Sequence, residues 1–457
     1  MSSFNQFISL FRHQDLRILI LQITMLAICI GCPFAEATQN DPGDGYTNDQ
    51  CTECHEEMAD DHGKSRHSDI QCLECRQQAA EEAHEEVLLP SVDCRQCHAP
   101  HDEKVAHDAH LGVSCEACHL NQVSPVKDSD SGQIQWKIDR RPDGISAVHS
   151  MLRTDDDAFC RRCHTNGNAI GAVAMVLPAK SVMCMPCHAA TFSLGDTITL
   201  IALIFFGLGI LGAASIWFSG SQPGDEVSGM GSNLFKTIHS IVAVIFSNRI
   251  FSVVKALILD GLLQRRLFRI SRSRWFIHAL IFFPFLFRFC WGLMALLASI
   301  WLPKWQGAWI MLDKNHPLSA FLFDLSGVLV ILGVILILVR KYVPGTGDKL
   351  KGLPKADWPA YSLMGGIMIV GFLLEAMRIA MTGTPQGSQY AFLGYTISRL
   401  FGGDDLTGIY GYMWYLHAIF TGAFMAYLPF SRMFHMIMAP ISLALAAAAQ
   451  QHRSELA

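Results

Sequence analysis

Five copies of the pattern Cys-x-x-Cys-His lie between residues 51 and 188, and no other feature constrains this chain as strongly. Two thiols three positions apart, followed at once by an imidazole, suit covalent attachment of haem c, whose iron the histidine binds. Zinc sites built from paired Cys-x-x-Cys units are the alternative, but they do not require a histidine after every second cysteine. The motif cysteines are Cys51, Cys54, Cys94, Cys97, Cys115, Cys118, Cys160, Cys163, Cys184 and Cys187, and the motif histidines are His55, His98, His119, His164 and His188.

A sixth cysteine pair, Cys72 and Cys75, is followed by Arg76 instead of a histidine. The sequence around this pair repeats with a period of 43 residues, and Arg76 falls where the next copy has His119. The repeat therefore places the pair at a haem-binding position that lacks its proximal ligand. The iron there would use a substitute such as His84 or have an open site, so we expect five or six covalent haems.

Histidines outside the motifs can supply the second axial ligand of these haems. His67 and His110 occupy equivalent positions in the repeat and are the best candidates, followed by His149 upstream of the fourth motif. With only about 30 residues for each haem, the macrocycles themselves must supply most of the core. We therefore expect residues 38–196 to form a small, loop-rich domain of short helices around a haem stack.

The N-terminal sequence predicts export of this domain. An apolar run at residues 16–31 precedes Ala35-Glu-Ala37, which is typical of a signal-peptide cleavage site. We expect residues 1–37 to be removed, with an uncleaved anchor as the alternative, and the haem domain to be periplasmic. Residues 38–190 carry a net charge of −13, against +8 for the remainder. This charge favours a basic periplasmic electron carrier as a partner and disfavours nucleic acid.

The second half of the chain predicts a membrane domain. Hydrophobic residues make up 51% of the whole chain and charged residues only 16%. Lys and Arg concentrate between the first and second apolar segments and between the third and fourth, which places these loops in the cytoplasm. Five segments are long enough to span a bilayer, namely 197–218, 276–300, 318–340, 359–381 and 409–430.

These segments predict an all-α protein of the bacterial inner membrane, with a five-helix haem b bundle after the haem c domain. Its first helix is 197–218, and residues 219–275 form a cytoplasmic linker and amphipathic segment. Residues 276–448 then complete a cytochrome b-like domain, and residues 449–457 form a cytoplasmic tail.

Histidines in the spans are candidate ligands of one or two haem b groups. His278 opens the second span and His435 lies near the cytoplasmic end of the fifth, so this pair is predicted to hold one haem b. His417 lies 18 residues before His435, so on a continuous helix both would lie on one face, about 27 Å apart. His417 therefore needs an outer partner, and we expect it to be His316.

Four ionisable residues, Arg288, Asp324, Glu375 and Arg378, fall in the outer half of the predicted spans. Charged side chains at membrane depth are costly and usually functional. Glu375 and Arg378 stand three residues apart on one helix, so simple ion pairing is one interpretation. The other is a quinone site, in which a carboxylate accepts the protons of quinol and an arginine orients a ring oxygen or a haem propionate.

Three stretches of the membrane half and one histidine spacing form a specific pattern. They are Arg274-Trp-Phe-Ile-His278, Gly371-Phe-Leu-Leu-Glu-Ala-Met-Arg378, Leu428-Pro-Phe-Ser-Arg-Met-Phe-His435-Met-Ile-Met-Ala-Pro440 and the spacing of His417 from His435. Through this pattern residues 235–448 resemble the gamma (cytochrome b) subunit of respiratory nitrate reductase and its relatives in heterodisulfide-reductase-like and sulfite-reduction membrane complexes. The resemblance implies a di-haem b subunit that exchanges electrons with quinone and has a cytoplasmic iron–sulfur partner. Arg288 departs from the nitrate reductase pattern, which has a second histidine there, and simple gamma subunits lack a fused multihaem domain.

These features predict an oxidoreductase subunit that passes electrons between the quinone pool, through haem b, and periplasmic c-type haems. One alternative is a transmembrane electron conduit in a larger complex with a cytoplasmic iron–sulfur subunit. Another is a periplasmic reductase of a small molecule such as nitrite, acting at an open haem on Cys72 and Cys75.

Overall fold

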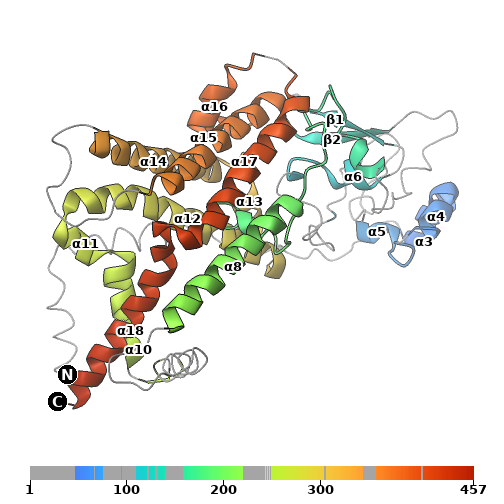
Figure 1. Cartoon of the computed structure of the whole chain (residues 1–457). Coiled ribbons are helices and arrows are strands. Elements are labelled where there is room, and N and C mark those ends of the chain that lie inside the picture. The colour runs from blue at the N-terminus through green and yellow to red at the C-terminus, as the bar shows by residue number, and fades with distance from the viewer. Residues whose placement is uncertain are drawn as a thin grey trace. The chain divides into compact units, whose positions relative to one another are not determined.

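The structure is a computed structural model in which the chain is mostly helical (Figure 1). It divides into two compact units, one of Met1–Cys54 with Gln71–Pro90 and the other of His55–Ile70 with Ser91–Ala457. The predicted signal peptide, Arg76, His84, Cys97, His98 and His149 lie outside the described residues. The structure describes residues 47–65, 67–75, 94, 110–120, 123–128, 132–138, 158–219, 242, 244, 246–247, 249–302, 305–342, 357–402 and 405–456.

The first unit contains two short helices that each carry a cysteine pair, α3 (Asn48–Cys54) and α5 (Cys72–Cys75). Asn48 joins them, because its side-chain amide donates to Gln71 Oε1 at 2.7 Å and its Oδ1 accepts from Leu73 N at 3.0 Å. The first Cys-x-x-Cys-His motif and the pair that precedes Arg76 are therefore neighbours.

The second unit begins with short elements around the remaining motifs, and one of them corrects the all-α prediction. Strands β1 and β2 form an antiparallel hairpin in which Val123 pairs with Ile138. Its β-branched residues favour extended backbone, and Val123 and Ile134 are buried. Gly132 takes the positive φ of 70° that the turn requires. The elements are α4 (Glu56–Gly63), α6 (Cys115–His119), β1 (Val123–Lys127), β2 (Ile134–Ile138), α7 (Ala158–Arg161) and η5 (Val182–Cys184).

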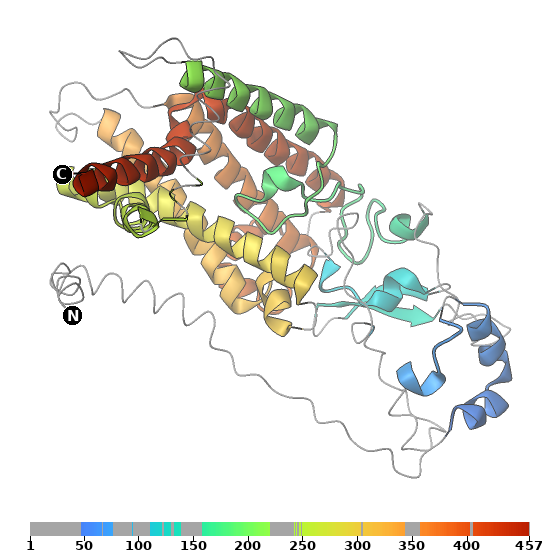
Figure 2. The ribbon, with the colours of Figure 1, turned by 90° about the horizontal axis from the view of Figure 1, so that it is seen from below.

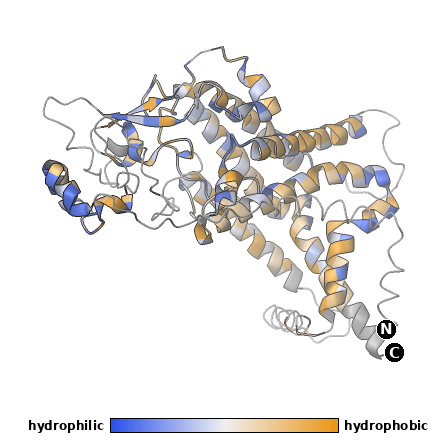
Figure 3. Cartoon of the chain, turned by 180° about the vertical axis from the view of Figure 1, so that it is seen from behind, coloured by the Kyte–Doolittle hydropathy of each residue, from blue (hydrophilic) through white to orange (hydrophobic). Residues whose placement is uncertain are grey.

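Long apolar helices follow and coincide with the predicted spans. Within the described residues, four helices are long and apolar enough to cross a membrane, or five if the bent pair at 407–448 counts as one span. In Figure 3 the ribbons of these helices are mostly orange, for hydrophobic residues, whereas the helices of residues 48–63 are mostly blue. Helix α15 packs against α17, α12 against α14 and α8 against α17, as Figures 1 and 2 show for the last pair. The helices are α8 (Thr197–Ser219), α12 (Arg272–Trp301), α14 (Pro317–Tyr342), α15 (Trp358–Met381) and α17 (Thr407–Tyr427).

The end of the fifth span corrects a second prediction. Helix α17 stops at Tyr427, two 3₁₀ turns follow, and α18 leaves at a bend of 75°. Pro429 lacks the N–H that would continue the helix. His417 and His435 therefore do not lie on one continuous helix, and His435 begins a new one. The elements are η8 (Leu428–Phe430), η9 (Arg432–Phe434) and α18 (His435–Leu456).

Asp357, which caps the start of α15, holds this bend in place. Its Oδ1 accepts from the Tyr427 hydroxyl at 3.1 Å, and its Oδ2 accepts from the Arg432 backbone N at 2.8 Å. Both ends of the bend are thus tied to one carboxylate, which fixes where His435 emerges.

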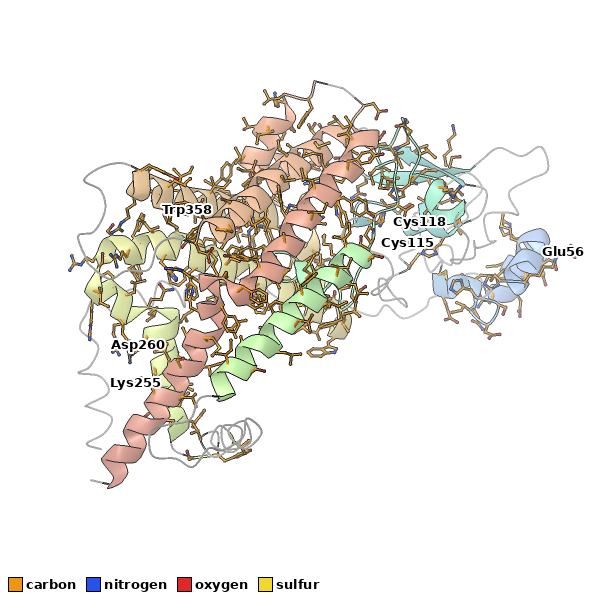
Figure 4. The ribbon with its side chains drawn as sticks, in the orientation of Figure 1. Glu56, Cys115, Cys118, Lys255, Asp260 and Trp358 are labelled. Carbon is orange, nitrogen blue, oxygen red and sulfur yellow. The ribbon has the colours of Figure 1, made fainter. Side chains whose placement is uncertain are left out.

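The predicted amphipathic segment is a series of short helices, of which α10 packs against α18. Asp260, in the π-helix that follows α10, accepts from Arg265 and Arg266 at 3.0 and 3.1 Å and is labelled with Lys255 in Figure 4. Its helices are α10 (Arg249–Ala256), the π-helix η6 (Leu257–Leu262) and α11 (Arg265–Ile270). The helices of the remaining connections are α13 (Gln306–Leu312), η7 (Ser388–Tyr390) and α16 (Phe392–Ser398).

Candidate functional site

The predicted pair of His278 and His435 comes together at one end of the bundle. Their ring centroids are 5.9 Å apart. When two imidazole nitrogens bind the same iron, each at about 2 Å, the ring centres lie about 6 Å apart, so the observed spacing fits two axial ligands. His278 Nδ1 donates to Gln264 Oε1 at 2.9 Å, and His435 Nδ1 donates to Arg432 O at 2.7 Å. Both acceptors are oxygens, so each ring keeps the Nε2 lone pair for a metal.

Gln264 is a part of this site that the sequence did not reveal. It is 7% exposed and holds a left-handed backbone with φ 52°, which is uncommon for a residue other than glycine. It lies between η6 and α11, so the chain reverses there and directs the amide toward His278. An isolated glutamine in a basic segment carries no sequence signal for this role.

A second pair differs from the sequence prediction. The ring facing His417 is that of His188, the histidine of the fifth motif, at 6.2 Å between centroids. His188, His417, Cys184 and Cys187 all line one cavity. The expected partner, His316, instead directly precedes α14, where its Nδ1 accepts from Leu318 N at 3.3 Å. Sequence depth alone could not show that the fifth motif reaches the membrane helices.

Close backbone contacts seat the fifth motif on the bundle. A Cβ at Gly292 of α12 would lie 2.6 Å from His188 O, so only glycine permits this approach. Met183, within the motif loop, is 2% exposed, and a Cβ at Gly422 of α17 would lie 3.8 Å from its sulfur. Ser181 caps η5, the 3₁₀ turn that ends at Cys184, by accepting from Met183 N at 3.3 Å.

The environment of the fifth motif suits a neutral ligand. Removal from water holds the pKa of His188 well below its ordinary value, and the nearby charges of Lys180 and Arg288 act in the same direction. Burial also raises the pKa of Cys187 to about 11, against the opposing effect of Arg288. The imidazole is therefore in the uncharged form that binds metals.

A third imidazole pair involves the histidine of the fourth motif. His110, a predicted distal ligand, faces His164 of the fourth motif at 6.1 Å between centroids. His164 Nδ1 donates to Val173 O at 2.6 Å, which again leaves Nε2 for a metal. Arg162 ties this motif to α6, donating to Ala117 O at 3.0 Å and to Leu120 O at 2.9 Å.

Thiols of different motifs also lie close together, since the side chain of Cys94 in the second motif hydrogen-bonds that of Cys115 in the third. Cys115 and Cys118 lie together on α6 (Figure 4), and the pKa of Cys118 is raised to about 11 by burial and then by Cys163. His55 is exposed, and His67 and His119 are partly buried. Among the described side chains, no three of His, Cys, Asp or Glu converge on one point as a closed zinc site would require.

The predicted acidic residues meet beside the cavity of the fifth motif. Asp324 is 1% exposed, and its Oδ2 accepts from Leu393 N at 2.6 Å and Gly394 N at 3.3 Å. The carboxyl group of Glu375 faces that of Asp324. A Cβ at Gly394 would lie 2.7 Å from Glu375 Cγ, so glycine makes room for this pair.

The two predicted arginines have different surroundings. Arg378 donates to Asn315 Oδ1 at 2.7 Å and stands 4.0 Å from Glu375, so its closer partner is the amide rather than the carboxylate. Arg288 is buried, donating to Ser326 Oγ at 2.7 Å and to Phe323 O at 2.6 Å. Asn315 and Ser326 are contributors that the sequence did not single out.

Comparisons with known proteins agree with part of the predicted resemblance. The chain is 24% identical over 260 residues to a subunit of the dihydromethanophenazine:CoB--CoM heterodisulfide reductase of Methanosarcina mazei, covering 54% of this chain and 90% of that protein. The chain is similar to a heterodisulfide reductase subunit. The corresponding protein of Methanosarcina barkeri is 24% identical over 254 residues, covering 53% of this chain and 87% of its own length. No protein-family model and no solved structure matches the chain.

The similarity and the apolar helices together support a membrane electron-transfer subunit of a larger complex. The resemblance to heterodisulfide-reductase-like complexes is thus supported, whereas the nitrate reductase gamma subunit has no matching family model.

Proposed function

We propose that this protein transfers electrons between the quinone pool and covalently attached c-type haems, as a membrane subunit of a larger complex. The observation that carries the proposal is the His278–His435 pair, 5.9 Å apart with both Nδ1 atoms donating to oxygen. A pair fixed in this tautomer at this spacing is suited to one haem iron and has no obvious role in packing.

The two proposed haem sites lie at different positions along helix α12. His278 and Gly292, which His188 contacts, are both on α12, and 14 residues correspond to about 21 Å along a helix. This is less than the roughly 30 Å of a bilayer core, so both sites fit within or at the edge of the membrane. Haem bound at these positions supplies one-electron carriers, and the protein residues fix its ligands and orientation.

The carboxyl pair supplies the proton chemistry of the proposed reaction. Oxidation of a quinol to a quinone releases two electrons and two protons. Glu375 and Asp324, which face each other, would accept the protons in turn and release them to the outer face. Arg378, held by Asn315, would orient a ring oxygen. Haem held by His278 and His435 would supply one-electron transfer toward an oxidised carrier outside the membrane, and the reverse direction would use the same groups.

Replacing Glu375 by glutamine tests the quinone part of the proposal. Glu375→Gln keeps the shape of the side chain but removes the proton acceptor, so quinol-linked haem reduction should slow by about 100-fold with haem content unchanged. The measurement is stopped-flow absorbance of the haem bands after addition of a quinol analogue. Glu56→Gln, at an exposed position of α4, is the matched control and should behave like the wild type. An unchanged rate in Glu375→Gln would remove this residue from the mechanism.

A second candidate is an electron conduit whose cytoplasmic end docks an iron–sulfur subunit. Two observations favour it, the similarity to a subunit of a multisubunit reductase and the basic residues that surround the start of α12. Affinity purification of the full chain from its native membrane tests it. A co-purifying iron–sulfur subunit would support the conduit, and electron transfer from quinol by the isolated chain would favour the first function. The basic residues are Arg265, Arg266, Arg269, Arg272 and Arg274.

A further inference from the structure

We propose that the outer haem site of the membrane bundle holds the covalent haem c of the fifth motif, with His417 of α17 as its distal ligand. The inference rests on the proposed function, because it assumes that the motifs carry haem. It replaces a second, non-covalent haem b by a haem whose two ligands come from the exported segment and from a membrane helix.

The spacing of the two rings is that of two axial ligands on one iron. His188 and His417 lie 6.2 Å apart, close to the 5.9 and 6.1 Å of the other two imidazole pairs. All three values match the roughly 6 Å expected for two imidazoles on one iron. His188 directly follows Cys187, so the ring that faces His417 belongs to an attachment motif.

The cavity between these rings also contains the attachment groups. It is lined by both motif cysteines, Cys184 and Cys187, together with His188 and His417. His188 and His417 are the only histidines among the described residues that line this cavity. A haem tethered through Cys184 and Cys187 would therefore lie in the space where His417 is available as the second ligand.

The motif lies in direct contact with the membrane helices. His188 O would be 2.6 Å from a Cβ at Gly292, so the motif backbone rests directly on α12. Gly371 of α15 lies next to the His417 ring, since a Cβ there would be in ordinary contact with His417 Cε1 at 3.4 Å. The segment that precedes the motif is also bound to α17, because the backbone N–H of Ala174 donates to the backbone oxygen of Thr407 at 3.0 Å.

The other candidate partners of His417 are engaged elsewhere. Arg288 occupies the position where the nitrate reductase pattern has a histidine, and it is committed to Ser326 and Phe323. His316 accepts from the backbone of its own helix and is not among the residues that line the cavity. His417 therefore meets an imidazole from the exported segment rather than one from another span.

The test replaces His417 in the purified full-length protein. In His417→Ala, intact mass should show the same number of covalent haems, and pyridine haemochrome spectra the same single haem b as the wild type. One haem c should change from low spin to high spin in the electron paramagnetic resonance spectrum. His417→Met should restore a low-spin signal with a methionine–iron absorption band, and it also serves if the alanine variant does not accumulate.

Two control variants complete the design. His316→Ala should leave every signal unchanged, and His278→Ala should remove the haem b while the covalent haems stay. Loss of a haem b from His417→Ala, with all haem c signals unchanged, would overturn the inference, as would two haem b groups in the wild type. A wild-type protein without covalent haem would instead refute the proposed function itself.

Discussion

At the scale of single residues, the most informative feature is which ring nitrogen of each imidazole donates a hydrogen bond. His164, His278 and His435 all donate from Nδ1 to an oxygen, so each presents Nε2. Such acceptors fix the orientation of a ligand ring and raise its basicity. For His278 the acceptor is a side chain, Gln264, which can therefore be changed without altering the backbone of the site.

We expect Gln264→Leu to weaken haem b retention by about 10- to 100-fold, because His278 loses its acceptor. Gln264→Glu keeps an acceptor and adds a negative charge near the iron. It should retain haem b and shift the midpoint potential to a more negative value, since the charge favours the oxidised state. Haem b content and redox titration measure these effects. Full retention of haem in the leucine variant would show that the hydrogen bond does not support the ligand.

At the scale of elements, glycines decide where the segment that precedes α8 meets the long apolar helices. Gly292 faces His188, and Gly411 faces Met175 at 3.0 Å from a built Cβ to the sulfur. Gly171 has φ 76° and a Cβ there would overlap the backbone of Met381. Lys127 of β1 adds a hydrogen bond to Thr382 O beyond the end of α15, and burial lowers the pKa of this lysine. These contacts join the loops to three helices.

Gly292→Val should disturb the fifth motif while leaving the other end of α12 intact. The new side chain would push against the backbone of His188, and overpacking of this kind costs about 1–3 kcal/mol. We expect a lower Tm and an altered low-spin signal of one haem c, with the haem b spectrum unchanged. Gly212→Val on α8, where a Cβ meets nothing within 4 Å, is the matched control. Equal spectra for both variants would mean that the loop does not depend on this contact.

At the scale of the whole molecule, charge separates the chain into two parts. Residues 38–190 carry a net charge of −13 and the remainder +8. Much of the positive charge lies around α11 and the start of α12, at the end of the bundle that holds His278. From the positive-inside rule we predict that this end faces the cytoplasm and that the end that carries the fifth motif faces outward.

Reporter fusions test this orientation. Green fluorescent protein fused after residue 457 should fluoresce, because α18 follows the bend at the basic end of the bundle. Alkaline phosphatase fused after residue 196, before α8, should be active because that point should lie outside. The opposite pattern would reverse the topology and exclude a periplasmic haem domain.

The sequence predicted the features that depend on local spacing. The apolar lengths of α8, α12, α14 and α15 indicated helices that can span a bilayer, and the structure has them at those positions. The depth of His278 and His435 indicated that they would pair. The hairpin of β1 and β2 was missed, because its strands are short and lie in a region whose dominant signal was the cysteine motifs.

The amino-acid sequence by itself determined the Cys-x-x-Cys-His motifs, the long apolar segments and the charge of each part, because these follow from residues close together along the chain. Only the tertiary structure decided the partner of His417 and the break before His435. The partner of His417 depends on Gly292, which has no side chain and so lets the backbone of His188, far away in the sequence, approach α12. The second depends on Pro429 and on a carboxylate, Asp357, that ties both sides of the bend to another helix. Such contacts arise from packing between distant segments, which no local pattern encodes.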